Sequence, residues 1–141
     1  MILYLDTSSL VKLYLEEAHS DAVLSWFADA KVIATSIVAY PEFLSALSRR
    51  TRAGDLTAEQ RDSLSGRFDT QWGQFLVLPV ADRAAGRLAL EHGLRGFDAV
   101  HLAAACAVRE QSAGGTLFFS SFDHGLNKAA KSEGLRVLTV E

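Results

Sequence analysis

Short apolar runs alternate with stretches of helical periodicity along the chain. The runs that predict buried strands cover residues 2–5, 31–35, 75–80, 116–120 and 135–140. Apolar residues at helical spacing predict about seven helices, over residues 9–17, 20–30, a segment ending near 52, 57–72, 82–93, 97–111 and 122–133. This alternation is typical of a single α/β domain, here residues 1–141, with a mostly parallel five-stranded sheet covered by helices on both faces.

Local signals mark several element boundaries. Residues 57–60, Thr-Ala-Glu-Gln, have the form of a capping box that opens a helix. Asp82 is a predicted cap, and Gly93 is predicted to end the same helix. Pro41 is either the first residue of its helix or a kink one turn in. A turn is predicted at residues 114–115, Gly-Gly.

The composition indicates a globular chain from a reducing compartment. With 49% hydrophobic and 22% charged residues, 141 residues are enough for one domain with a real core. Cys106 is the single cysteine, so no internal disulfide is available and a cytoplasmic location is expected. Asp98 and His101 interrupt the longest apolar stretch, which excludes a membrane helix, and Asp6 interrupts the amino-terminal run, which excludes a signal peptide.

Four carboxylates are hard to explain as ordinary surface residues. Asp6 and Asp123 come just after the first and fourth predicted strands. Glu42 stands in the helix after the second strand, and Asp98 opens the most apolar of the predicted helices. In a parallel sheet, the carboxyl ends of strands and the first turns of the following helices share one edge. The four acids are therefore expected to meet there.

Grouped carboxylates need a cation, because they cannot all stay ionised side by side. An all-oxygen site without cysteine or clustered histidine suits Mg²⁺ or Mn²⁺ better than zinc. Such an ion can activate water against a phosphodiester. The alternative is that Asp6, Asp98 and Asp123 only cap helices and Glu42 is a solvated surface residue. The net charge of −3 does not exclude a nucleic-acid partner, since removing four metal-bound acids leaves +1.

The residues around these acids resemble the PIN domains. The matching segments are Leu3–Ser9 (Leu-Tyr-Leu-Asp-Thr-Ser-Ser), Glu42 in a helix, Leu94–Ala103 (Leu-Arg-Gly-Phe-Asp-Ala-Val-His-Leu-Ala) and Ser121–Asp123 (Ser-Phe-Asp). Within this family the chain is most similar to the VapC-type toxins of bacterial toxin–antitoxin pairs. The similarity extends from Leu3 to Val140, and the segment around Asp98 is its most specific part.

The resemblance implies a three-layer α/β/α fold and a Mg²⁺-dependent endoribonuclease. Asp6, Glu42, Asp98 and Asp123 would be the catalytic, metal-binding acids, and Ser9 and Ser121 their supporting hydroxyls. It also implies a homodimer and a small VapB-like antitoxin whose carboxyl-terminal segment covers the site and sets an arginine against the acids. Alternatives are a PIN-domain nuclease for RNA processing or DNA without an antitoxin, and a non-catalytic binding module. A phosphatase with Asp6 as nucleophile is disfavoured, because that chemistry needs a second aspartate where Ser8 stands.

Basic residues near the acids are candidates for RNA or antitoxin contact. These are Lys12, Arg49 and Arg95, of which Arg95 is closest in sequence to an acid. Arg49 belongs to a cluster with Arg50 and Arg52 that also fits a solvated helix end favoured by the helix dipole. His101 shares a helical face with Asp98, and a buried, hydrogen-bonded histidine is the favoured interpretation over a general base or ligand.

Overall fold

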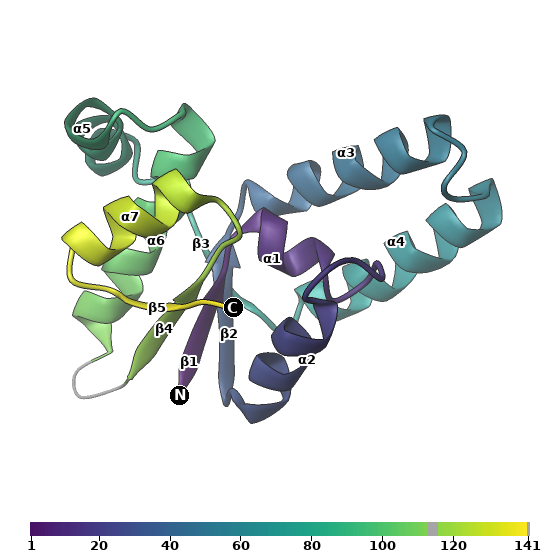
Figure 1. Ribbon diagram of the computed structural model, residues 1–141, viewed down its shortest axis with the longest axis horizontal. Coiled ribbons are helices and arrows are strands. Elements are labelled where there is room, and N and C mark those ends of the chain that lie inside the picture. The colour runs from purple at the N-terminus through teal and green to yellow at the C-terminus, as the bar shows by residue number, and fades with distance from the viewer. Residues whose placement is uncertain (113–115, 141) are drawn as a thin grey trace.

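Five parallel strands form the central sheet of the computed structural model, which describes residues 1–112 and 116–140 (Figure 1). They are joined in the order β3–β2–β1–β4–β5. β1 lies in the middle, paired with β2 on one side and β4 on the other. The strands are β1 Ile2–Leu5, β2 Val32–Ser36, β3 Leu76–Leu78, β4 Leu117–Ser120 and β5 Arg136–Leu138.

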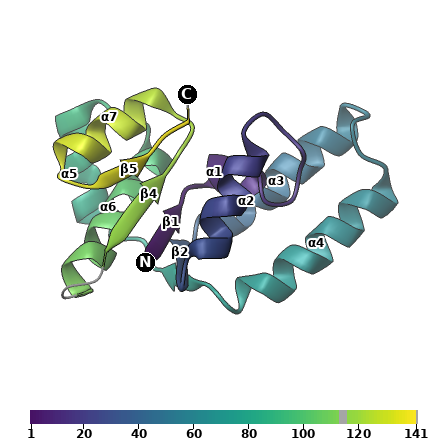
Figure 2. The same ribbon diagram turned by 60° about the horizontal axis from the view of Figure 1, so that its bottom comes forward.

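Helices cover both faces of the sheet (Figures 1 and 2). α5, α6 and α7 lie on one side and α1 to α4 on the other, and α3 and α4 form a hairpin that extends away from the sheet. The predicted three-layer α/β/α architecture is confirmed. The helices are α1 Thr7–Val11, α2 Ser20–Asp29, α3 Ala39–Arg52, α4 Ala58–Trp72, α5 Asp82–His92, α6 Gly96–Gln111 and α7 His124–Ser132.

The alternation of side chains along β1 divides the core into two clusters. Tyr4 points into the cluster beneath α5, α6 and α7, whereas Leu3 and Leu5 point into the cluster beneath α1 to α4. All three side chains are fully buried, because a central strand of a parallel sheet has both faces covered. No helix among the described residues is long and apolar enough to cross a membrane.

The segment after β1 differs from the predicted long helix. α1 ends at Val11, and Tyr14 then donates its backbone N–H to Val11 three residues back, in a tighter turn than an α-helix makes. The Ser20 hydroxyl holds the end of this segment by accepting from the Glu17 N–H and donating to the Leu15 carbonyl. The apolar spacing of residues 9–17 therefore reflects a short helix followed by turns.

Other boundaries follow their local chemistry. Thr57 and Gln60 form the predicted capping box of α4, and Gly93 ends α5 in the left-handed region at φ 66°. Asp82 is the first residue of α5 instead of its cap, and its carboxylate accepts from the Arg83 N–H. Pro41 is the third residue of α3, where an N–H would have no partner within the helix. The predicted turn at residues 114–115 lies outside the described residues.

Candidate functional site

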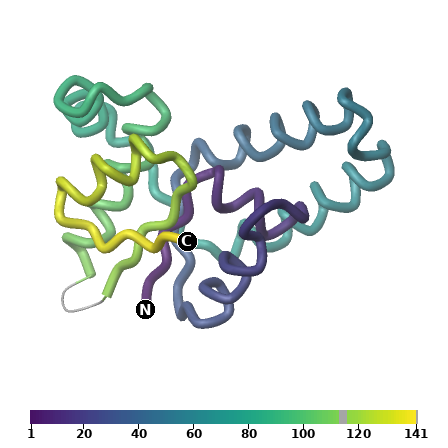
Figure 3. The backbone as a smooth tube through the Cα atoms, viewed as in Figure 1, coloured from purple at the N-terminus to yellow at the C-terminus, as the bar shows by residue number. Residues whose placement is uncertain are grey.

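The winding of the chain creates a crevice at the carboxyl ends of β1 and β4. The backbone trace in Figure 3 leaves β1 towards α1 and leaves β4 towards α7, which lie on opposite sides of the sheet. Such a point is where open α/β sheets bind ligands. A cleft of about 660 Å³ lies here, lined by residues that include Asp6, Thr7, Ser8, Glu42, Arg49, Arg95, Phe97, Asp98, His101 and Asp123. The four predicted acids are thus brought into one cleft.

Asp6 is the most buried of the four acids, at 4% exposed. It is the N-cap of α1, and its Oδ1 accepts from the Ser9 N–H at 3.0 Å and from the Ser8 hydroxyl at 2.6 Å. Burial raises the pKa of Asp6, and the electrostatic effect of His101, followed by hydrogen bonds that include those from Ser8 and Ser9, opposes that rise. The local fold therefore fixes this carboxylate at the base of the cleft.

Asp98 and Asp123 share a guanidinium. Arg95 places its Nε 3.4 Å from Asp98 Oδ2 and its Nη2 3.7 Å from Asp123 Oδ2. Burial and the charge of Asp123 raise the pKa of Asp98, while Arg95 opposes the rise. Asp123 uses its Oδ1 to cap α7, accepting from the Leu126 N–H at 2.9 Å. Its Oδ2 is the oxygen that lies near the Arg95 guanidinium. This aspartate is therefore both a helix cap and part of the site.

Glu42 is held by a chain of side chains that ends in the core. Its Oε1 accepts from the Thr7 hydroxyl at 2.5 Å and lies 3.0 Å from Nε2 of His101, whose Nδ1 is 2.8 Å from the Tyr4 hydroxyl. Because a carboxylate only accepts, Nε2 donates to Glu42, and Nδ1 is left to pair with the Tyr4 hydroxyl. Burial alone would raise the pKa of Glu42, but hydrogen bonds from His101 and Thr7 outweigh it and lower the pKa.

The donor set fits a hard divalent cation. Three of the acids are partly open to the cleft, with 27%, 24% and 38% of the side chain exposed in Glu42, Asp98 and Asp123. Their oxygens do not form a closed cage. In the described part of the chain, the only three ligand atoms within 4.8 Å of one another belong to Glu91, His92 and Glu133, outside this cleft. An open set of carboxylates suits Mg²⁺, which keeps several of its waters.

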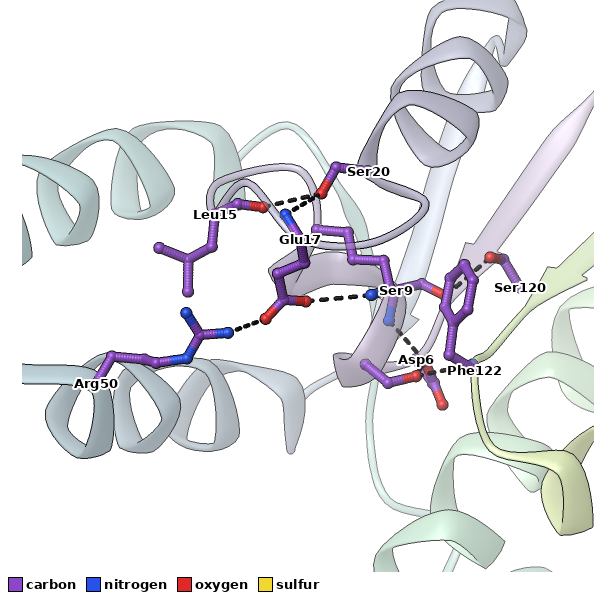
Figure 4. Close-up of polar contacts among 10 residues, drawn as sticks. Asp6, Ser9, Leu15, Glu17, Ser20, Arg50, Ser120 and Phe122 are labelled. Carbon is purple, nitrogen blue, oxygen red and sulfur yellow. Dashed lines mark hydrogen bonds and ion pairs between the residues drawn. The ribbon is translucent and has the colours of Figure 1, made fainter. Parts of the chain in front are cut away.

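The predicted supporting hydroxyls lie behind the cleft. Ser9 is fully buried, and its hydroxyl is bonded to that of Ser120 at 2.8 Å, so only its backbone N–H reaches Asp6 (Figure 4). Ser121 accepts from the Asp123 N–H at 3.0 Å. Ser8 lines the cleft beside Thr7, and its hydroxyl accepts from the Phe122 N–H.

The basic residues differ in how accessible they are. Arg95 is 85% exposed at the mouth of the cleft, and Arg49 lines the same cleft. Lys12 does not line it: this side chain is 11% exposed, 3.2 Å from Glu17, and lies over the ring of Phe122. Arg50 also contacts Glu17 (Figure 4), which ties α3 to the segment after α1.

Sequence reasoning missed the roles of Thr7, Ser8 and Tyr4. The run Thr7-Ser8-Ser9 signalled a hydroxyl beside Asp6 but not which hydroxyl faces it. His101 is confirmed as a buried histidine, 2% exposed, with both ring nitrogens bonded. One of its partners is Glu42, so the buried histidine also belongs to the site.

Removing the Tyr4 hydroxyl tests the hydrogen-bonded series of side chains from Tyr4 through His101 to Glu42. Tyr4→Phe is expected to lower the free energy of unfolding by about 1–3 kcal/mol, because it leaves the buried Nδ1 of His101 without its partner. Urea denaturation measures the change. Tyr40→Phe is the control, since that hydroxyl bonds to the surface residue Asp69, and a change within about 0.5 kcal/mol is expected. Equal losses in both variants would contradict the assignment.

Comparisons with known proteins identify the family of this chain and its structural neighbours. The PIN domain family matches residues 3–132. Ribonuclease VapC45 of Mycobacterium tuberculosis is 32% identical over 139 residues, which cover 96% of this chain and 94% of that protein. FitAcB from Neisseria gonorrhoeae has a TM-score of 0.69 at 19% identity, covering 99% of this chain and 97% of its own. The structure of VapBC2 from Rickettsia felis, bound to a DNA fragment from the VapBC2 promoter, has a TM-score of 0.66 at 16% identity. The match covers 100% of this chain and 100% of that one.

Proposed function

The chain belongs to the PIN-domain family and, within it, to the VapC-type ribonuclease toxins, and on that premise we propose how it cleaves RNA. Asp6, Glu42, Asp98 and Asp123 would hold a divalent ion, Mg²⁺ or alternatively Mn²⁺. Water would form a new bond to phosphorus as the ester bond to the leaving ribose oxygen breaks. The observation that carries this proposal is the meeting of four carboxylates from distant segments in one cleft. When bound, the ion supplies Lewis-acid activation of the phosphate and the water.

The protein's own residues have separate tasks in this reaction. Ser8 and the Ser9 N–H keep the buried Asp6 in place. His101 and Thr7 keep Glu42 ionised and oriented, as its lowered pKa indicates. Arg95 and Arg49 stand at the rim, where a guanidinium can bind the phosphates on either side of the scissile bond.

A small VapB-like antitoxin is the proposed regulatory partner. Arg95 supports this, because its position shows that a guanidinium fits beside both Asp98 and Asp123. An arginine from an antitoxin segment would find the same two carboxylates. A homodimer and a cytoplasmic location complete the proposal, the latter because a chain with one cysteine needs no oxidising compartment.

Metal removal tests the proposed reaction. The purified protein is incubated with a mixture of fluorescent oligoribonucleotides in Mg²⁺, in EDTA, and in EDTA followed by excess Mg²⁺ or Mn²⁺. Cleavage is expected with the metal, loss with EDTA, and recovery when metal is restored, because carboxylates alone cannot neutralise the developing phosphate charge. In parallel, metal at 100 times its dissociation constant is expected to stabilise the fold by about 2.7 kcal/mol.

Each alternative function predicts a different outcome of this experiment. Cleavage that persists in EDTA would contradict the metal mechanism. Equal cleavage of DNA of the same sequence would favour a PIN-domain nuclease of broader substrate range. RNA left intact and no metal-induced stabilisation would favour a non-catalytic binding module in which the acids only cap helices.

A further inference from the structure

An exposed aromatic ring stands beside the metal-binding acids. Phe97 is 57% exposed, although burying such a ring would contribute about 1.5–3 kcal/mol. Of the seven large hydrophobic side chains that are exposed in the described structure, it is the only aromatic one. The other six are aliphatic: Leu24, Val32, Ile37, Leu76, Val80 and Leu90.

Phe97 contributes to neither hydrophobic cluster of the protein. It lies in the first turn of α6, between the exposed Arg95 and Asp98, and lines the cleft that holds the four acids. Scattered exposed hydrophobic residues are common and need no explanation. A lone aromatic ring on the wall of a nucleic-acid cleft differs from them, because its face is available to a base.

We propose that Phe97 stacks on a base of the RNA and thereby fixes the neighbouring phosphate at Asp98. This inference rests on the proposed function, since it assigns a positioning residue to the same cleft. A base can stack on an aromatic ring only when it is free of its own neighbours, so the RNA must present an unstacked nucleotide at the scissile bond.

The surroundings of Phe97 suit a base with its attached phosphate. Arg95 is 85% exposed and two residues away, so its guanidinium can bind the backbone phosphate while the ring holds the base. Gly96 separates these residues, and a Cβ atom at this position would meet nothing within 4 Å. Apart from these two chain neighbours and the backbone of α6 itself, no atom therefore crowds the surface at Gly96.

A tryptophan at this position reports the contact directly. In Phe97→Trp, oligouridylate added in EDTA is expected to quench fluorescence, because the indole would stack on a base. The two native tryptophans, Trp26 and Trp72, pack against the cluster on the opposite side of the sheet and provide a constant background. The same oligonucleotide in a duplex with its complement is expected to quench much less.

The affinity for oligouridylate distinguishes stacking on an aromatic ring from contact with any large apolar side chain at position 97. Phe97→Leu is expected to weaken oligouridylate binding about 5- to 150-fold, the range that corresponds to 1–3 kcal/mol per stacked base, whereas Phe97→Tyr keeps the affinity. Leu90→Ala, at an exposed aliphatic residue outside the cleft, is the matched control and leaves the affinity unchanged. The metal-induced rise in melting temperature is expected to be the same in these three variants and in wild type.

The outcomes distinguish this inference from the proposed function. If wild-type protein binds and cleaves RNA and Phe97→Leu binds it equally well, stacking is overturned and the nuclease stands. If wild type binds neither metal nor RNA, both proposals fail together. If Phe97→Leu changes the mass of the assembly in light scattering while RNA affinity is unchanged, Phe97 is a protein contact instead.

Discussion

Asp98→Asn is expected to lower RNA cleavage by more than about 100-fold and to abolish the metal-induced rise in melting temperature. The metal supplies several kcal/mol of transition-state stabilisation, and each 1.36 kcal/mol is tenfold in rate. Asparagine keeps the shape of the side chain but removes the charge that would hold the cation beside Asp123. Single-turnover cleavage and thermal melts with Mg²⁺ or EDTA measure the two effects.

The same variant separates loss of function from loss of folding. Burial and the charge of Asp123 raise the pKa of Asp98 in the folded protein, so at neutral pH its ionised form disfavours the fold. In EDTA, Asp98→Asn should therefore melt no lower than wild type. Asp82→Asn is the control, because Asp82 opens α5 as an exposed acid outside the cleft. A variant at Asp98 that still gains stability from metal would rule out its role as a ligand.

Phe68→Ala is expected to lower the free energy of unfolding by about 3–5 kcal/mol, the usual cost of deleting a buried aromatic ring. Phe68 is fully buried in α4, and its ring centroid lies 4.1 Å from that of Phe43 on α3. It also lies 5.5 Å from Tyr14 and 5.4 Å from both Tyr40 and Trp72. These rings hold the α3–α4 hairpin together where it leaves the sheet.

Urea denaturation of Phe68→Ala and of Leu90→Ala measures this cost. Leu90 is 89% exposed, so its truncation is expected to change stability by no more than about 0.5 kcal/mol. A loss below about 1 kcal/mol for Phe68→Ala would mean that the hairpin opens independently of the rest of the domain. Because α3 carries Glu42, such local opening would also disturb the cleft.

The fold could be predicted from the sequence because its main signals are local. The run at residues 2–5 is apolar on every position, and the structure shows why: the strand is central and covered on both faces. The capping box at Thr57 and the left-handed Gly93 also depend only on neighbouring residues. The helix expected over residues 9–17 was wrong, because the hydroxyl of Ser20 and the pairing of Glu17 hold that segment in turns.

The four acids could be placed in one cleft from topology alone, but their support could not. Which of three consecutive hydroxyls faces Asp6 depends on the tight turn of α1 and on the register that sets Leu5 opposite Ser120. Capping a helix and taking part in the site are also not exclusive roles for an aspartate. In Asp123, Oδ1 caps α7 while Oδ2 lies 3.7 Å from the Arg95 guanidinium in the cleft.

The central place of β1 has a consequence for the order of events during synthesis. β1 is synthesised before the other strands of the sheet, yet one of its neighbours, β4, follows only after α6 has been made. Pairing over such a distance along the chain is slow, and the domain folds as a unit. The cleft around Asp6 therefore cannot assemble until the segment that carries Asp98 and Asp123 has been synthesised. A chain that stops before α7 therefore lacks the proposed site and is expected to cleave no RNA.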